Sequence, residues 1–133
     1  MKNNKLNIPF YLGILLYVIS FFLPTIQFSL GVKLLGWETV FIQWSEIVFV
    51  KNTAEYLQFL LSSLTNLWVV GLIIGGISNS TNRLFRLILA ILALVTSFSW
   101  LFVFENNSIL LYGFYVWLLS IILIVVGRFL EKK

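Results

Sequence analysis

Four apolar stretches dominate the sequence and restrict the folds open to it. They cover residues 8–23, 57–77, 84–104 and 109–130. A helix of about 20 apolar residues matches the hydrocarbon thickness of a bilayer, roughly 30 Å. The chain has 133 residues, of which 60% are hydrophobic and 11% charged, and a soluble domain of this length has too small an interior for them. The pattern predicts an all-α transmembrane fold, a four-helix bundle forming a single integral membrane domain.

The limits of the first two stretches are set by different signals. Asn7 can cap the first helix, Pro9 suits its first turn, and Pro24 marks its end, because the residue before a proline avoids helical geometry. The second stretch is strongly apolar only from Leu67 to Ile77, which is too short to cross a bilayer. It must therefore recruit polar residues back to about residue 57, and we expect those polar groups to face other helices.

The basic residues fall into two unequal groups if the chain crosses a membrane four times. Two of the nine, Lys33 and Lys51, lie in the segment 24–56. The others share the opposite side: Lys2, Lys5, Arg83, Arg86, Arg128, Lys132 and Lys133. Cytoplasmic segments of membrane proteins carry an excess of lysine and arginine. We therefore expect both termini in the cytoplasm and residues 24–56 as an outer loop.

The first part of the outer loop has the pattern of a short strand. Ile26, Phe28 and Leu30 alternate with smaller or polar residues, which is the period of a β-strand. Gly31 can turn the chain into a second extended segment over residues 32–35. The loop is thus expected to carry a short β element.

The second part of the loop changes to a helical period. One face of this predicted amphipathic helix is apolar: Trp37, Val40, Phe41, Trp44, Ile47 and Val48. The other face is more polar: Glu38, Thr39, Ser45 and Glu46. Such a helix is expected to lie on the outer leaflet, where a tryptophan ring can be buried while its N–H stays hydrated.

The residue types absent from the chain exclude several kinds of chemistry. The sequence contains no cysteine, no histidine and no aspartate. It therefore has no Ser-His-Asp or Cys-His catalytic set and no histidine-ligated metal or haem. The basic residues gather at the expected cytoplasmic ends instead of forming one stripe, which argues against a nucleic-acid surface. We expect no catalytic residue, no cofactor and no metal.

Three residues of the second stretch are candidates for helix packing. Gly71 and Gly75 form a GxxxG pattern, which lets a second helix approach closely. That helix can belong to the same chain or to a second copy. Asn66 can make a hydrogen bond between helices, cap a helix at the outer interface, or line an uncharged pore.

Four short motifs occur in order along most of the chain: Ser20-Phe-Phe-Leu-Pro24, Gly36-Trp-Glu38, Asn66-Leu-Trp68 and Leu111-Tyr-Gly-Phe-Tyr-Val-Trp-Leu-Leu-Ser120. Together they resemble small uncharacterised bacterial membrane proteins with four spans. The sequence departs from that family at Leu67, where the family has proline. The resemblance implies four spans and the bacterial cytoplasmic (inner) membrane, and it carries no established activity. The layout is also similar to the claudin-like plan, without the claudin loop cysteines.

These features favour a non-enzymatic membrane interaction protein, such as an accessory subunit, an assembly factor or an immunity-type protein. Its partners would be the lipid bilayer and another membrane protein or itself, with Trp37, Glu38, Trp44 and Glu46 as candidate partner-binding residues. One alternative is a homo-oligomeric pore or small-solute channel. Another is an enzyme or transporter acting on lipids, with a glutamate as acid or base.

Overall fold

The computed structural model describes residues 7–28, 30–46, 53–78, 82–103 and 108–130. Within these ranges the chain forms five helices and three strands. In chain order they are α1 (Ile8–Ser20), β1 (Pro24–Phe28), β2 (Lys33–Leu35), α2 (Gly36–Glu46), α3 (Thr53–Ile77), α4 (Arg83–Val103), β3 (Ser108–Leu110) and α5 (Tyr112–Leu130).

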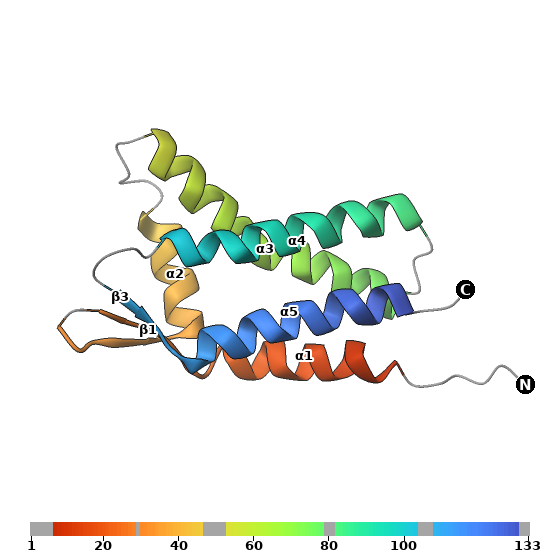
Figure 1. The fold of residues 1–133 in the computed structure, drawn as a ribbon, viewed down its shortest axis with the longest axis horizontal. Helices are drawn as coiled ribbons and strands as arrows, with labels where there is room; N and C mark the ends of the chain where they lie inside the picture. Colours follow the sequence, from red (N-terminus) through yellow and green to blue (C-terminus); the bar gives the residue numbers. More distant parts are fainter. Residues whose placement is uncertain (1–6, 29, 47–52, 79–81, 104–107, 131–133) are drawn as a thin grey trace, which may run out of the picture.

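The four longer helices form a bundle with a small cap at one end (Figure 1). α1 packs along α5 and α3 packs along α4, while α5 also contacts α3 and α4 and thus lies at the centre. The cap consists of β1, β2, β3 and α2, and it lies where α1 ends and α5 begins. The start of α1, the end of α3, the start of α4 and the end of α5 lie at the opposite end.

A side-chain cap and a turn set the limits of α1. Asn7 Oδ1 accepts a hydrogen bond from the backbone N–H of Phe10 at 3.3 Å, and a proline occupies the first turn, as predicted. The helix ends at Ser20, before the predicted limit at residue 23. The reason is a turn in which the N–H of Leu23 donates to the carbonyl oxygen of Ser20 at 3.3 Å, after which Pro24 begins a strand.

The predicted β element and loop helix are confirmed as a hairpin followed by α2. β1 and β2 pair antiparallel, with Ile26 opposite Leu34. Gly31 lies between them with a φ of 79°, a left-handed conformation that glycine adopts without a steric penalty. α2 follows β2 directly, so the change from a period of two to a helical period marks a real boundary.

β3 corrects the prediction that the last apolar stretch is helical from residue 109. Residues Ser108–Leu110 pair antiparallel with β1, and α5 begins only at Tyr112. The N–H of Leu111 then donates to the carbonyl oxygen of Thr25 at 2.8 Å, which continues the pairing. A short apolar run is compatible with either a strand or a helix. Here residues 108–110 are extended because they pair with β1. The sheet order is therefore β2-β1-β3.

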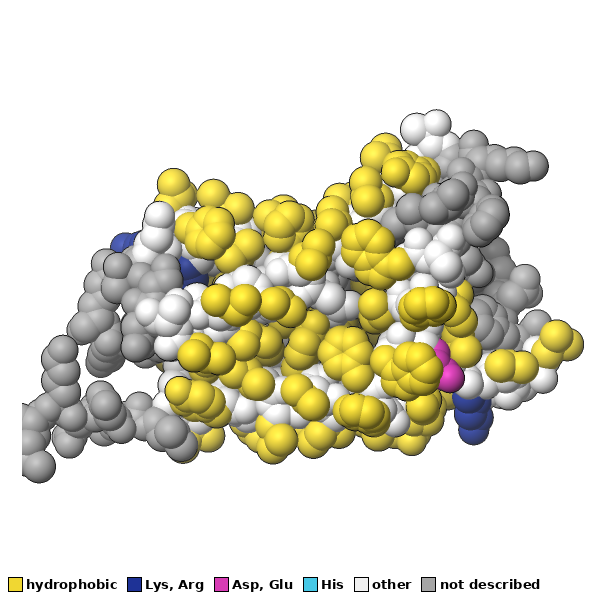
Figure 2. Space-filling view, turned by 180° about the vertical axis from the view of Figure 1, so that it is seen from behind, with side chains coloured by type: hydrophobic (Ala, Val, Ile, Leu, Met, Phe, Trp, Pro, Cys, Tyr) yellow, Lys and Arg dark blue, Asp and Glu magenta, His cyan; other side chains and the backbone are white. Residues whose placement is uncertain are grey.

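Large apolar side chains cover the outside of the longer helices, and Figure 2 shows them across one face of the molecule. Examples are Leu15 on α1, Ile74 on α3, Val95 on α4 and Val126 on α5, all exposed. The buried polar or charged side chains are Ser20, Thr25, Thr39, Gln43, Ser63, Thr65, Thr96, Ser97, Ser120 and Arg128. The interior also contains an apolar core, which includes Phe10, Leu72, Trp100, Ile121 and Ile124. The feature that is unusual for a soluble fold is therefore the large number of apolar side chains left exposed on the helices.

Two helices in the described part of the chain are long and apolar enough to cross a membrane. By length and composition these are Arg83–Leu101 within α4 and Tyr112–Leu130, which is α5. Two shorter apolar helical segments, Ile8–Ser20 and Ser63–Ile77, lie in α1 and α3.

Two glycines bring the backbones of α1 and α5 into close contact. A Cβ atom built on Gly127 would lie 2.6 Å from the backbone nitrogen of Phe10, and one on Gly13 would lie 2.8 Å from the backbone nitrogen of Ile124. Backbone atoms cannot move aside as the end of a flexible side chain can. The helices therefore approach at these positions only because neither residue has a side chain.

Substituting Gly127 by alanine is expected to destabilise the protein, whereas the same change at Gly71 is not. The Gly127→Ala methyl group would overlap the backbone of α1, and overpacking of this kind costs about 1–3 kcal/mol. A Cβ on Gly71 would meet only a side-chain carbon of Leu89, at 3.2 Å. Gly71→Ala should change stability by less than about 1 kcal/mol, because the Leu89 side chain needs to shift by only a few tenths of an ångström. Unfolding by sodium dodecyl sulfate in mixed micelles measures both; equal effects would contradict the packing described.

Candidate functional site

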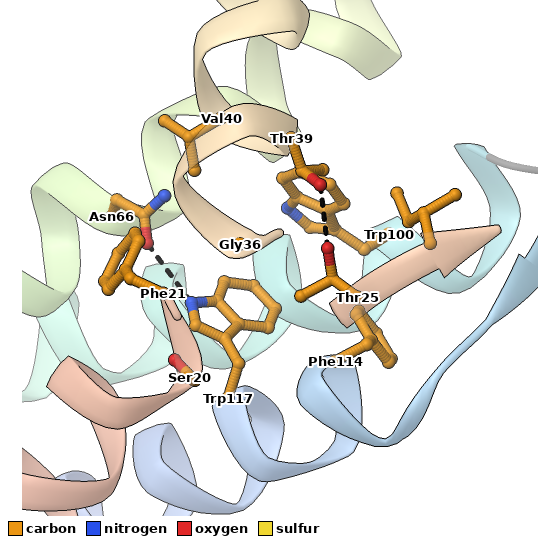
Figure 3. A pocket seen from close by; sticks show the side chains of 11 residues that line it. Ser20, Phe21, Thr25, Gly36, Thr39, Val40, Asn66, Trp100, Phe114 and Trp117 are labelled. Carbon is orange, nitrogen blue, oxygen red and sulfur yellow. Dashed lines mark hydrogen bonds between the residues drawn. The ribbon is translucent and has the colours of Figure 1, made fainter. Parts of the chain in front are cut away.

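A mostly apolar pocket lies between the cap and the bundle (Figure 3). The space between its lining residues is about 350 Å³ when the part open to the surroundings is included. Its lining comes from all five helices, from the residue after α1 and from β1, the central strand of the sheet. The lining residues are Ser20, Phe21, Thr25, Ile26, Gly36, Thr39, Val40, Asn66, Trp100, Phe114 and Trp117. None of these side chains is charged, so the pocket is suited to an uncharged group.

Asn66 joins three helices at the side of the pocket. Its Oδ1 accepts a hydrogen bond from the hydroxyl group of Tyr17 on α1 at 2.7 Å, and another from Nε1 of Trp117 on α5 at 3.2 Å. The indole N–H can only donate, so the amide oxygen must be the atom that faces it. In Figure 3 the amide nitrogen of Asn66 is turned away from Trp117. Both of these side-chain bonds of Asn66 to described residues are therefore made by its oxygen.

The hydroxyl groups at the top of the pocket bind one another and the backbone. Thr25 Oγ1 and Thr39 Oγ1 are 2.7 Å apart, which ties the central strand to α2. Thr39 Oγ1 also donates to the carbonyl oxygen of Leu35 at 3.0 Å. On the opposite wall Ser20 Oγ donates to the carbonyl oxygen of Tyr17 at 2.6 Å. The hydroxyl groups are therefore satisfied within the protein, and the pocket behaves as a largely apolar surface.

Glu38, a candidate partner-binding residue, caps the helix on which it lies. Its Oε2 accepts a hydrogen bond from the backbone N–H of Leu35, immediately before α2, at 2.8 Å. This is the carboxylate half of a capping box, in which the third helical residue reaches back to the cap residue. The N–H of Trp37 donates to the carbonyl oxygen of Phe21 at 3.1 Å. The first bond caps α2, and the second ties the start of α2 to the turn that follows α1.

The aromatic face of α2 points away from the bundle. Trp37, Phe41 and Trp44 are 52%, 71% and 42% exposed, respectively. The side chains directed inward are the buried Thr39 and Gln43. The helix thus exposes its apolar side and buries part of its polar side. α2 ends at Glu46, the fourth candidate, whose side chain lies outside the described residues.

Of the two candidate helix-packing glycines, Gly71 faces another helix of the same chain. Gly71 faces the side chain of Leu89 on α4. Gly76, next to the predicted pair, faces the ring of Phe10 on α1. Gly75 lies between them in sequence and is half-buried.

Several pocket residues were not selected from the sequence. Trp100, Phe114 and Trp117 form its aromatic wall, with the rings of Trp100 and Trp117 centred 5.6 Å apart. The only sequence signal was the position of tryptophan and tyrosine within apolar stretches, where a polar ring atom needs a partner. That signal indicates a hydrogen bond but does not identify the acceptor.

Two further observations bear on the chemistry of the site. Within the described ranges, no group of three or more histidine, cysteine, aspartate or glutamate side chains could hold a metal ion. No family model, curated protein or solved structure matches the chain. A function can therefore be inferred only from the residues of the site itself.

Replacing Asn66 by leucine is expected to lower the free energy of unfolding by about 1–2 kcal/mol, because two buried donors lose their acceptor in an apolar setting. The residue pair Asn66 and Tyr17 can be tested by a double-mutant cycle. Tyr17→Phe should cost less in the Asn66→Leu background than in the natural protein, since the acceptor is already gone. Unfolding in mixed micelles gives the four free energies. Additive costs would show that the two side chains are not coupled.

Proposed function

We propose that the chain is a four-span protein of the bacterial cytoplasmic membrane, with α1, α3, α4 and α5 crossing the bilayer. The observation that supports this most is the exposure of large apolar side chains on all four helices, although the interior already holds an apolar core mixed with buried serine and threonine side chains. An exposed apolar surface of this extent would associate in water, whereas lipid solvates it. α1 is the shortest of the four, at about 20 Å for 13 residues, and the turn over residues 21–23 extends it.

The proposed orientation places the cap outside and both termini in the cytoplasm. Arg83, Arg86 and Arg128 lie at the end opposite the cap, whereas Lys33 lies in the cap. The guanidinium group of Arg86 lies over the ring of Phe129 at 5.6 Å. This distribution of described charges supports the orientation that the whole sequence predicts from the positive-inside rule.

The function we propose is non-enzymatic: the protein binds another membrane protein through the aromatic face of α2. This face combines exposed Trp37, Phe41 and Trp44 with a helix whose start is fixed by the Glu38 cap and the Thr39 hydroxyl group. A pre-ordered surface loses little conformational entropy on binding. Tryptophan is also the residue most enriched among those that contribute strongly to protein interfaces. Together these features support an accessory subunit, assembly factor or immunity-type protein.

The alternatives receive less support from the contacts described. A pore assembled through the predicted glycine pair of α3 would use Gly71, which already faces Leu89 of α4 within the chain. A lipid-acting enzyme using Glu38 as acid or base would need the carboxylate that caps α2. Neither alternative predicts that crosslinking recovers a second membrane protein whose binding depends on Trp37 and Trp44.

Changing Trp37 and Trp44 together to alanine is expected to remove the partner. Crosslinking in native membranes, followed by affinity purification and mass spectrometry, should recover a reproducible second membrane protein with the natural chain. Recovery with the double variant should fall at least about tenfold, because truncating one such tryptophan costs roughly 2 kcal/mol.

The matched control is the double variant Phe98→Ala and Tyr115→Ala, which removes two exposed aromatic side chains from α4 and α5. It should leave recovery unchanged. Equal recovery with the natural chain and the tryptophan variant would refute binding through α2. Recovery of the protein alone, as a defined oligomer, would favour the pore.

A further inference from the structure

We propose that the start of α4 and the end of α5 form a binding site for the phosphate group of an anionic phospholipid, with Arg83 and Arg86 as the residues that bind it. This inference rests on the membrane location proposed above and adds a lipid site at the cytoplasmic end of the bundle. It does not depend on α2 or on a protein partner.

The two arginines lie on the same side of α4. Arg83 is the first residue of the helix, and Arg86 follows three positions later. Residues with this spacing share a helix face, with Cβ atoms roughly 5–6 Å apart, so both guanidinium groups can reach one phosphate group. The planar guanidinium group donates several N–H groups in a fork that matches phosphate oxygens. The N-terminus of α4 adds a partial positive charge beside them.

The described carboxylates lie far from these two positive charges. Within the described ranges the acidic residues are Glu38 and Glu46 on α2 and Glu55 in the first turn of α3. Both of those helix segments are at the cap end, whereas α4 begins at the opposite end (Figure 1). Arg128 is buried within the bundle and has contacts of its own, so we do not include it in the site. Like charges that lie close together on a helix repel, and an anion bound between them removes that repulsion.

Phe129 on α5 holds one of the two guanidinium groups in place. Cζ of Arg86 lies 5.6 Å from the centre of the Phe129 ring, which is within the range of a cation–π contact. A guanidinium group that stacks on a ring through its face still has the N–H donors of its edge for an anion. The Arg86 side chain is thus ordered before a phosphate group binds, which reduces the conformational entropy lost on binding.

Exposed apolar side chains lead from the site toward the middle of the bundle. On α4, Leu87 and Ile91 are exposed beyond the arginines, and on α5 the exposed residues Phe129, Val126 and Ile122 share one helix face. Figure 2 shows basic side chains near apolar ones at this end of the molecule. Acyl chains can lie on these surfaces while the phosphate group is at the arginines. A free phosphate ion would gain nothing from them, which favours a phospholipid as the ligand.

Native mass spectrometry of lipid binding tests the site. The purified protein in detergent micelles is titrated with phosphatidylglycerol or with phosphatidylcholine that has the same acyl chains. We expect one phosphatidylglycerol to bind about tenfold more tightly than phosphatidylcholine, which corresponds to about 1.4 kcal/mol. The double variant Arg83→Gln and Arg86→Gln should lose this preference, because no guanidinium group then faces the phosphate.

Two further variants separate the site from a general attraction between basic residues and an anionic lipid. Lys2→Gln with Lys5→Gln removes the same charge from the same predicted side of the membrane, so it should leave the preference unchanged. Phe129→Leu removes no charge but frees the Arg86 side chain. It should weaken phosphatidylglycerol binding about threefold and leave phosphatidylcholine binding unchanged.

Each outcome decides between the site and the membrane location. Equal affinities for the two lipids, or an equal loss with the Lys2 and Lys5 control, would overturn the site and leave the location intact. Displacement of phosphatidylglycerol by millimolar inorganic phosphate would show a site for free phosphate and overturn the lipid proposal. Flotation with phosphatidylcholine vesicles after an alkaline wash tests the location alone, and a chain that does not float would overturn it. If the arginine double variant does not fold, Phe129→Leu still decides, because unchanged binding would refute the site described.

Discussion

The close contact between α1 and α5 is the constraint on which the rest of the structure depends. It forms where Gly13 and Gly127 let the two backbones meet. α1 leads into β1, and β3 leads into α5. The two ends of the chain that meet as helices therefore also meet as strands, because β1 pairs with β3. The end of α1 then fixes the start of α2, since a Cβ on Gly36 would lie 2.6 Å from the carbonyl oxygen of Ser20. The pocket is a consequence of this series of contacts.

Hydrogen bonds between polar side chains in the interior help to select one arrangement of the helices. If lipid surrounds the helices, moving a leucine from lipid to the interior gains little, so small residues and polar contacts select the arrangement. Asn66 links three helices, and the pair Thr25 and Thr39 links the sheet to α2. α2 in turn presents aromatic side chains outward and Thr39 and Val40 inward, toward the pocket.

The sequence predicts those features that depend on neighbouring residues. The period change at Gly36 and the turn at Gly31 gave the hairpin and α2, and an asparagine within an apolar stretch was identified as a hydrogen-bonding candidate. Features that depend on distant residues were missed. β3 is extended because β1 lies beside it, and Gly13 and Gly127 matter because each faces a backbone from the other end of the chain. For the same reason the aromatic wall of the pocket was not predicted.

Labelling of single cysteines tests the central claim, a membrane bundle with the cap outside, most directly. The chain contains no cysteine, so each introduced thiol reports alone. Lys33 in the cap, Ser78 at the opposite end and Leu15 on α1 are all exposed in the structure. In intact cells a membrane-impermeant maleimide should label Lys33→Cys at once, Ser78→Cys only after the membrane is opened, and Leu15→Cys in neither case. Labelling of Lys33→Cys and Ser78→Cys from the same side, or of Leu15→Cys from water, would contradict the account.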